Sequence, residues 1–269
     1  MKSEQVRSMH PNTSDHHTPL KDQEKTTSFG YRKIAVNEKA GYVLRHFDSI
    51  AGKYDFMNTL LSFGIHYLWK RKAVQMADLP QGGLVIDVCG GTGDLAIRAA
   101  RLMGRRGRVI VYDINLAMLN NGSLKIIRAG LDAQIDCVQG DGEAICFAEG
   151  SFDTALIGFG IRNVTHMDTC LREMQRVLKP GGRFMCLEFS LPVTPWFASL
   201  YDFYSFRIMP LLGKMLAGTR DAYLHLPESI RMFPSPDAFK RMIEDAGFRK
   251  VRYKRLTNGI AVIYTGVKS

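Results

Sequence analysis

The sequence predicts a doubly wound α/β fold with a mostly parallel sheet, and three observations carry this prediction. A short apolar run at residues 85–88 breaks into three glycines, Gly90, Gly91 and Gly93, and resumes as a helical pattern, which indicates a strand, a tight loop and a helix. A second β-branched run at residues 108–113 ends on an acid 20 residues after Gly93. The same alternation of strands and helices continues to residue 189. In such folds ligands bind at the carboxyl ends of the strands, where the strand order reverses.

The length and composition allow one well-buried domain with an appendage, because the chain has 269 residues of which 46% are hydrophobic. We expect a disordered polar tail over residues 1–30 and a single domain over residues 31–269. The five cysteines form no CxxC pair, so we expect neither a disulfide framework nor a metal site. No run approaches the ~18 apolar residues of a membrane span and no signal peptide is visible, which favours a cytoplasmic protein.

The elements expected along the chain are read from apolar periodicity and from glycine and proline. Helices are expected at 39–77, from 94 onward, and at 115–131, 167–178 and 235–247, and strands at 85–88, 108–113, 135–143, 151–160, 183–189, 251–256 and 260–267. The last strand is expected to be antiparallel at the sheet edge. Residues 190–235 are rich in aromatic and apolar side chains and interrupt the alternation. We interpret them as a helical lid over the ligand crevice, or as a helical hairpin packed on the core.

The glycine loop indicates the class of ligand. Asp113 closes the second strand at the spacing that places a carboxylate on ribose hydroxyls. Asp87 and Asp94 flank the loop with negative charge, which would repel a pyrophosphate and suits a cation. A ribosylated cofactor with a positive centre is S-adenosylmethionine (SAM), and the loop resembles the first motif of class I SAM-dependent methyltransferases. Asp141, after the third strand, is a candidate for adenine recognition, with loop capping as the alternative.

Seven ordered motifs narrow the resemblance to one family. The chain resembles the UbiE/MenG/COQ5 family of quinone-biosynthesis C-methyltransferases at residues 53–58, 62–66, 90–94, 159–164, 178–182, 187–190 and 226–230. The resemblance implies SAM-dependent methylation of a ring carbon of a polyprenylated hydroquinone. The substrate would be demethylmenaquinol, the 6-methoxy-benzoquinol precursor of ubiquinone (2-polyprenyl-6-methoxy-1,4-benzoquinol), or both, and the sequence does not decide which.

The resemblance also implies which residues form the site. By position, the cofactor contacts are Thr92, Asp113, Asp141 with Gly142, and residue 158, and the glycine loop adds Asp87, Gly90, Gly91 and Gly93. Many relatives have Ser at position 158, whereas this chain has Gly158, so only a backbone contact is expected there. Arg162 and Asn163 follow the fourth strand beside the crevice, and the family comparison adds Tyr54 to the same site.

The chemistry of the implied substrate gives these residues roles. A ring carbon becomes a good nucleophile only when the neighbouring phenol loses its proton. Arg162 cannot be the base because a guanidinium keeps its proton in proteins, so we expect it to stabilise the phenolate or to orient a water that takes the proton. Asn163 and Tyr54 would complete the hydrogen-bonded set. His66 is the conventional base candidate or a structural residue, and Arg162 could instead only tie loops together through Glu188 or Asp168.

The expected partners follow from charge and apolar content. The net charge of +10 permits nucleic acid, an anionic membrane or an acidic protein, and composition does not choose among them. An RNA methyltransferase and a non-catalytic partner subunit of the same fold stay as alternatives, but no NPPY-type motif or paired catalytic cysteines are present, so we expect no nucleic acid. We expect a polyprenylated quinol substrate and transient membrane contact at the inner face through segment 196–216. A homodimer stays open.

Overall fold

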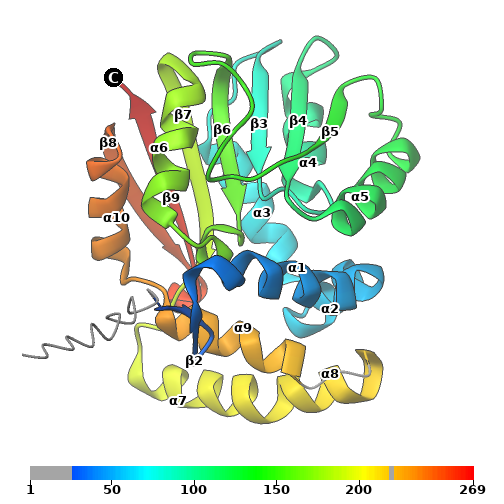
Figure 1. Ribbon diagram of the computed structural model, residues 1–269, viewed down its shortest axis with the longest axis vertical. Helices are drawn as coiled ribbons and strands as arrows, with labels where there is room; N and C mark the ends of the chain where they lie inside the picture. The colour runs from blue at the N-terminus through cyan, green and yellow to red at the C-terminus, as the bar shows by residue number, and fades with distance from the viewer. Residues whose placement is uncertain (1–25, 218–220) are drawn as a thin grey trace, which may run out of the picture.

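The computed structural model describes residues 26–217 and 221–269, and within them seven strands form the central sheet (Figure 1). The sheet order is β5-β4-β3-β6-β7-β9-β8. The strands are β3 (Leu84–Val88), β4 (Arg108–Asp113), β5 (Ile135–Gln139), β6 (Phe152–Gly158), β7 (Leu178–Phe189), β8 (Phe248–Leu256) and β9 (Ala261–Lys268). The chain runs outward from β3 through β4 to β5 and then returns to β6 on the other side of β3. The strand order therefore reverses between β3 and β6, as the doubly wound prediction requires.

The pairing of the strands confirms a mostly parallel sheet with an antiparallel last strand. β3, β4, β5, β6 and β7 pair in parallel, and β9 pairs antiparallel with both β7 and β8. The expectation that the last strand lies at the sheet edge is wrong, because β9 lies between β7 and β8 and the edge is β8. Strand β9 is buried along most of its length and β8 is largely exposed. The more apolar strand thus takes the interior position.

Helices cover both faces of the sheet. Helices α3 (Ile65–Met76), α4 (Asp94–Met103) and α5 (Leu116–Arg128) pack on one face, with Val85, Val109 and Leu156 of the strands. Helices α6 (Met167–Val177) and α10 (Pro236–Asp245) pack on the other, with Ile86 and Phe184. Successive strand residues point to opposite faces, so neighbouring residues such as Val85 and Ile86 join different cores.

The remaining elements gather beyond the carboxyl ends of the parallel strands (Figure 1). They are the hairpin β1 (Thr26–Phe29) and β2 (Arg32–Ala35), the helices α1 (Lys39–Ile50), α2 (Tyr54–Leu61), α7 (Pro195–Phe203), α8 (Met209–Ala217) and α9 (Asp221–Met232), and the short turns η1 (Val36–Glu38), η2 (Ala51–Lys53), η3 (Ile161–Asn163), η4 (Tyr204–Ile208) and η5 (Thr257–Gly259). Figure 1 shows α1 and α2 directly at the strand ends, with α7, α8 and α9 in a layer further out.

The tail predicted for residues 1–30 lies mostly outside the described residues, but residues 26–29, which fall within it, form strand β1. In the segment 190–235, residues 195–217 and 221–232 are helical, as expected. Among the described residues, no helix is both long and apolar enough to cross a membrane.

Candidate functional site

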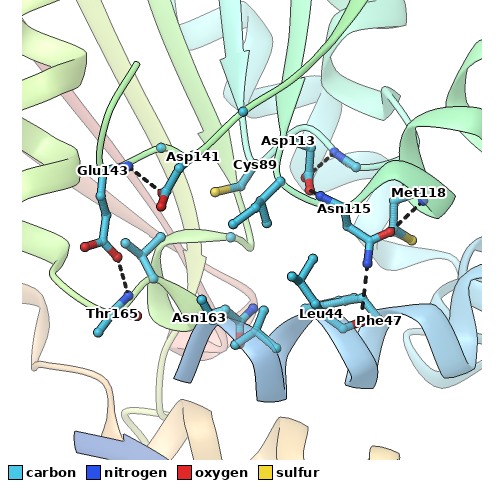
Figure 2. A pocket seen from close by; sticks show the side chains of 18 of the residues that line it. Leu44, Phe47, Cys89, Asp113, Asn115, Met118, Asp141, Glu143, Asn163 and Thr165 are labelled. Carbon is cyan, nitrogen blue, oxygen red and sulfur yellow. Dashed lines mark hydrogen bonds between the residues drawn. The ribbon is translucent and has the colours of Figure 1, made fainter. Parts of the chain in front are cut away.

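A cavity opens at the point where the strand order reverses. It has a volume of about 310 Å³ and lies at the carboxyl ends of β3, β4, β5 and β6, with α1 on its open side (Figure 2). Small-molecule sites occur preferentially at this position in open α/β sheets. Its lining comes from the N-terminal segments (Val36, Asn37, Ala40, Val43, Leu44, Phe47, Tyr54), from the β3 and β4 ends (Cys89, Gly91, Asp113, Ile114, Asn115, Met118) and from the β5 and β6 ends (residues 140–143, 158–160 and 163–166).

The glycine loop after β3 has a shape that only glycine permits at two positions. A Cβ at Gly90 would come within 2.8 Å of the Asp87 carbonyl oxygen. Gly93 precedes α4 with φ of 76°, in the left-handed region that glycine adopts without strain. Gly91 lines the cavity, whereas Gly90, Thr92 and Gly93 lie behind it. The loop therefore brings its backbone, rather than side chains, to the cavity wall.

Asp113 lies directly against this loop in the cavity wall (Figure 2). Its Oδ2 accepts a hydrogen bond from the Gly91 N–H at 2.9 Å and its Oδ1 accepts one from the Asn115 N–H at 2.8 Å. Burial raises the pKa of Asp113, while these two N–H groups oppose the shift. A carboxylate held in this way keeps further lone pairs directed at the cavity.

Asp141 lies on the opposite side of the cavity, after β5 (Figure 2). Its Oδ1 accepts from the Glu143 N–H at 2.8 Å, which is the loop-capping contact, and its side chain is exposed at the rim. The neighbouring Gly142 is buried in the wall. Glu143 in turn accepts from the Thr165 N–H at 2.8 Å and so joins the β5 loop to the loop after η3.

The ends of β3 and β6 carry backbone strain beside the cavity. Cys89 and Phe159 both have positive φ, at 52° and 58°, which is uncommon for residues other than glycine. Strained backbone of this kind clusters at functional sites.

At Gly158 a Cβ would lie 2.5 Å from Leu95 Cδ1, so the absence of a side chain there is also explained by packing against α4.

Asp87 is buried behind the loop and does not line the cavity. Its Oδ2 accepts from the Ala96 N–H at 3.2 Å, and its Oδ1 has no partner among the described residues. Burial raises the pKa of Asp87 to about 8, although the Ala96 N–H lowers it. The structure therefore places Asp87 under the loop, where it bonds to the start of α4 rather than to the cavity.

Helix α1 closes the cavity and is held at both of its ends. At one end the Lys39 Nζ donates to the Val164 carbonyl oxygen at 2.8 Å. At the other the Asn115 Nδ2 donates to Asp48 Oδ1 at 2.9 Å. The sequence predicted a helix here, but not that its face with Ala40, Leu44 and Phe47 lines the site. The apolar periodicity of α1 predicts that one face of the helix is buried, but it does not distinguish a face packed on the core from one that lines a cavity.

Two of the four residues proposed for catalysis lie in the cavity wall. Tyr54, at the start of α2, and Asn163, in η3, face it from different elements. No described residue of segment 190–235 lines the cavity, so its closure comes from α1 and α2 rather than from the expected lid.

Arg162 lies next to Asn163 but does not line the cavity. Its Nη1 pairs with Glu188 Oε1 at 2.9 Å and also donates to the Phe159 carbonyl oxygen. Its Nε lies 3.4 Å from Ser229 Oγ on α9. Burial raises the pKa of Glu188 and the charge of Arg162 opposes the shift. The guanidinium thus fixes the strained β6 loop to β7.

His66 stands apart from these residues, on α3. It is buried, and its Nδ1 lies 2.6 Å from Ser62 Oγ. Burial, followed by the charge of Lys70, lowers the pKa of His66 to about 4. It does not line the cavity.

Comparison with known proteins decides the family. The chain matches the model of the ubiE/COQ5 methyltransferase family over residues 33–268. The chain belongs to this family. The methyltransferase is 47% identical to the ubiquinone/menaquinone biosynthesis C-methyltransferase UbiE of Pseudoalteromonas translucida, over 91% of this chain and 98% of that protein. It is 46% identical to the protein of the same name from Hahella chejuensis, over 92% and 99%. The resemblance that the motifs indicated is confirmed.

Solved structures confirm the class I fold of the methyltransferase. A SAM-dependent methyltransferase from Aquifex aeolicus superposes with a TM-score of 0.58 at 16% identity, covering 80% of this chain and 98% of that one. A SAM-dependent methyltransferase from Thermotoga maritima gives 0.59 at 18% identity, covering 84% and 99%. At these identities the likeness concerns the fold. The SAM-dependent character of the family and of these neighbours agrees with the predicted cofactor class.

Proposed function

We propose that the protein transfers a methyl group from SAM to a ring carbon of a polyprenylated hydroquinone. The substrate is demethylmenaquinol, 2-polyprenyl-6-methoxy-1,4-benzoquinol, or both. The observation that carries the proposal is a cavity at the strand-order reversal of a ubiE/COQ5 family member, with Asp113, Tyr54 and Asn163 among its lining residues. When bound, SAM supplies an electrophilic methyl group.

The residues of the cavity fit SAM. Each oxygen of Asp113 accepts one backbone N–H, so both keep lone pairs for the two hydroxyls of a ribose. Gly91 and Gly142 offer backbone without side chains on either side. Asp141 at the rim is the acceptor for an exocyclic amine. Thr92 is a weaker candidate, because its Oγ1 donates to Asp55 at 2.8 Å.

The quinol oxygen is assigned to Asn163 and Tyr54, which face the cavity. Arg162 supports them, because its pairing with Glu188 fixes the loop that carries Asn163. Its Nη2 bonds to none of the described residues, and because Arg162 does not line the cavity we assign this donor to orienting the water that takes the proton. The proton acceptor is a water oriented by this set, since His66 lies outside the cavity wall.

The outer surface supports contact with a membrane, where the polyprenyl tail resides. Five apolar side chains along the continuous helical segment α7, η4 and α8 are each more than half exposed. They are spaced by four, three, eight and four residues: Trp196, Leu200, Phe203, Leu211 and Met215. The exposed Arg207 falls within the same series. An apolar helix face with a cation is typical of helices that lie on anionic bilayers. We assign the protein to the cytoplasmic side of the membrane, as a peripheral protein.

The function is tested by incubating the purified protein with methyl-labelled SAM and each demethylated quinol in turn. Transfer of label to a ring carbon of at least one quinol is expected. Label transfer to RNA but to neither quinol would overturn the proposal, and SAM binding without any transfer would favour a non-catalytic subunit.

A further inference from the structure

A chain of ion pairs runs behind the cavity wall and is not used by the chemistry proposed above. Lys70 Nζ lies 2.5 Å from Asp94 Oδ2, and Lys125 Nζ lies 2.5 Å from Asp94 Oδ1 and 2.6 Å from Asp55 Oδ2. Asp55 also accepts the Thr92 hydroxyl at 2.8 Å through its Oδ1. Both oxygens of Asp55 are therefore engaged.

These residues come from four different elements. Lys70 belongs to α3, Lys125 to α5, Asp55 to the first turn of α2, and Asp94 begins α4 directly after Gly93. The carboxylate of Asp55 thus bonds the start of α2 to the glycine loop through Thr92 and to α5 through Lys125.

The charges balance within the set, because two lysines face two carboxylates. Burial raises the pKa of Asp94, but Lys70 and Lys125 outweigh it and hold the pKa far below its usual range. For Lys125 burial lowers the pKa, and the charges of Asp94 and Asp55 reverse this and raise it. The bond between Lys125 and Asp94 is therefore made by two charged groups at neutral pH, which gives a short and directional contact.

Tyr54 directly precedes Asp55 and is the residue of α2 that lines the cavity. Its ring packs edge-on against Phe47 of α1, with the ring centres 6.0 Å apart. We propose that Asp55 is a positioning residue, whose bonds to Thr92 and Lys125 hold Tyr54 in the cavity wall. The inference rests on the role proposed for Tyr54 at the quinol oxygen. A displacement of about 1 Å at such a group can cost as much as 10²-fold in rate.

A role in stability alone makes a different prediction. Partly exposed ion pairs contribute only ~0–1 kcal/mol, and such a contribution would be the same whatever side chain occupied position 54. A positioning role requires the effect of Asp55 to depend on Tyr54. A double-mutant cycle measures this dependence.

The experiment measures kcat with saturating SAM and quinol for Asp55→Ala and Asp55→Asn, each in the wild-type and in the Tyr54→Ala background. Asp55→Ala is expected to lower kcat by about tenfold or more when Tyr54 is present. Asp55→Asn keeps an acceptor for Thr92 but loses the charge that faces Lys125, so its kcat is expected to lie between those of the wild type and Asp55→Ala. In the Tyr54→Ala background both substitutions are expected to change kcat by less than about twofold.

A second readout needs neither substrate nor SAM. Hydrogen exchange at the α2 amides, residues 55–61, should become faster in Asp55→Ala than in the wild type. The matched control is Asp153→Asn, which weakens the Asp153 to Lys179 ion pair of 2.7 Å at the amino end of β6 and should change neither readout.

The outcomes distinguish failure of the positioning role from failure of the proposed function. Equal fold-losses in both backgrounds, or unchanged α2 exchange, would overturn the positioning role while leaving the function intact. Wild-type kcat in Tyr54→Ala would overturn both that role and the assignment of Tyr54 to the quinol. If Asp55→Ala does not fold, Asp55→Asn and Lys125→Met carry the same cycle.

Discussion

Arg162 and Glu188 form a buried ion pair, with Nη1 and Oε1 2.9 Å apart and side chains 9% and 0% exposed. Glu188 Oε1 also accepts from the Phe189 N–H at 2.8 Å, so the same oxygen bonds to the guanidinium and to the backbone of its own strand. Of the two acids that the sequence offered as partners of Arg162, the structure selects Glu188. Asp168 pairs with Arg172 on the surface of α6 instead. Because the pair is buried, removing either charge leaves the other unpaired in a dry environment.

The first prediction concerns Arg162→Lys. Lysine keeps the charge but not the planar fork, so Glu188 and the Phe159 carbonyl can no longer be bonded together and the Nη2 donor is lost. We expect kcat to fall by about 10²-fold, the scale for losing assistance to a proton transfer, and Tm to fall by several degrees. Steady-state kinetics and thermal melts check this. Near-full turnover with a lower Tm would show that Arg162 only ties the loop to β7.

The second prediction concerns Asp113→Ala. Losing the carboxylate removes two charge-assisted hydrogen bonds to ribose, so SAM affinity should weaken by about 2 kcal/mol, roughly 30-fold. Titration calorimetry measures it. Asp136→Ala, on the neighbouring strand and in the exposed pair with Arg108, is the control and should bind SAM like the wild type. Equal affinity in Asp113→Ala would remove Asp113 from the cofactor site.

The third prediction concerns His66→Gln. Glutamine can keep a hydrogen bond to Ser62 Oγ, and the imidazole it replaces does not line the cavity. We expect kcat to stay within about threefold of the wild type, with the same dependence on pH. A loss of ~10²-fold, the scale of general-base catalysis, would instead make His66 the proton acceptor.

Local patterns predicted the parts of the site that lie in one stretch of chain. The glycine loop and Asp113 were found because strand, turn and helix signals follow one another within residues 85–113. The insertion of β9 between β7 and β8 could not be predicted from the sequence, because apolar periodicity indicates which face of a strand is buried but not which strands it pairs with. For the same reason the role of α1 as a wall was missed, and the burial of Asp87 behind the loop was visible only in three dimensions.

The fourth prediction concerns pH. Burial lowers the pKa of His46 and His66 to about 4 and that of His225 to about 3, from about 6.5 in the unfolded chain. Below pH 6.5 these histidines therefore bind protons in the unfolded state that they do not bind in the native state, and their contribution lowers the free energy of unfolding as pH decreases toward 4. Burial raises the pKa of Asp87 to about 8, so this carboxyl acts in the opposite direction, and the histidine contribution is measured by comparing variants. Thermal melts from pH 7 to 4 should show a less unfavourable change of Tm in His225→Phe than in the wild type, because the phenyl ring can keep the stacking on Phe29 and cannot bind a proton. The same change of Tm in both proteins would contradict the prediction.

The last prediction concerns the exposed stripe of α7, η4 and α8. Burying Trp196, Leu200 and Phe203 in the interface of a bilayer would remove apolar surface from water, and Arg207 would be attracted to anionic headgroups. In flotation with anionic liposomes at low salt, the protein should rise with the lipid, and the bound fraction should decrease as salt is added.

Substitutions at two equally exposed leucines distinguish membrane binding through this stripe from non-specific adsorption to the liposomes. Leu200→Ser should weaken flotation, whereas Leu124→Ser on α5 should not, although the two leucines are equally exposed at 55% and 54%. Both are single exposed leucines on helices, so their folding cost should be small and similar. If the two variants float equally well, or if the wild type does not bind anionic liposomes even at low salt, the stripe is not the membrane contact.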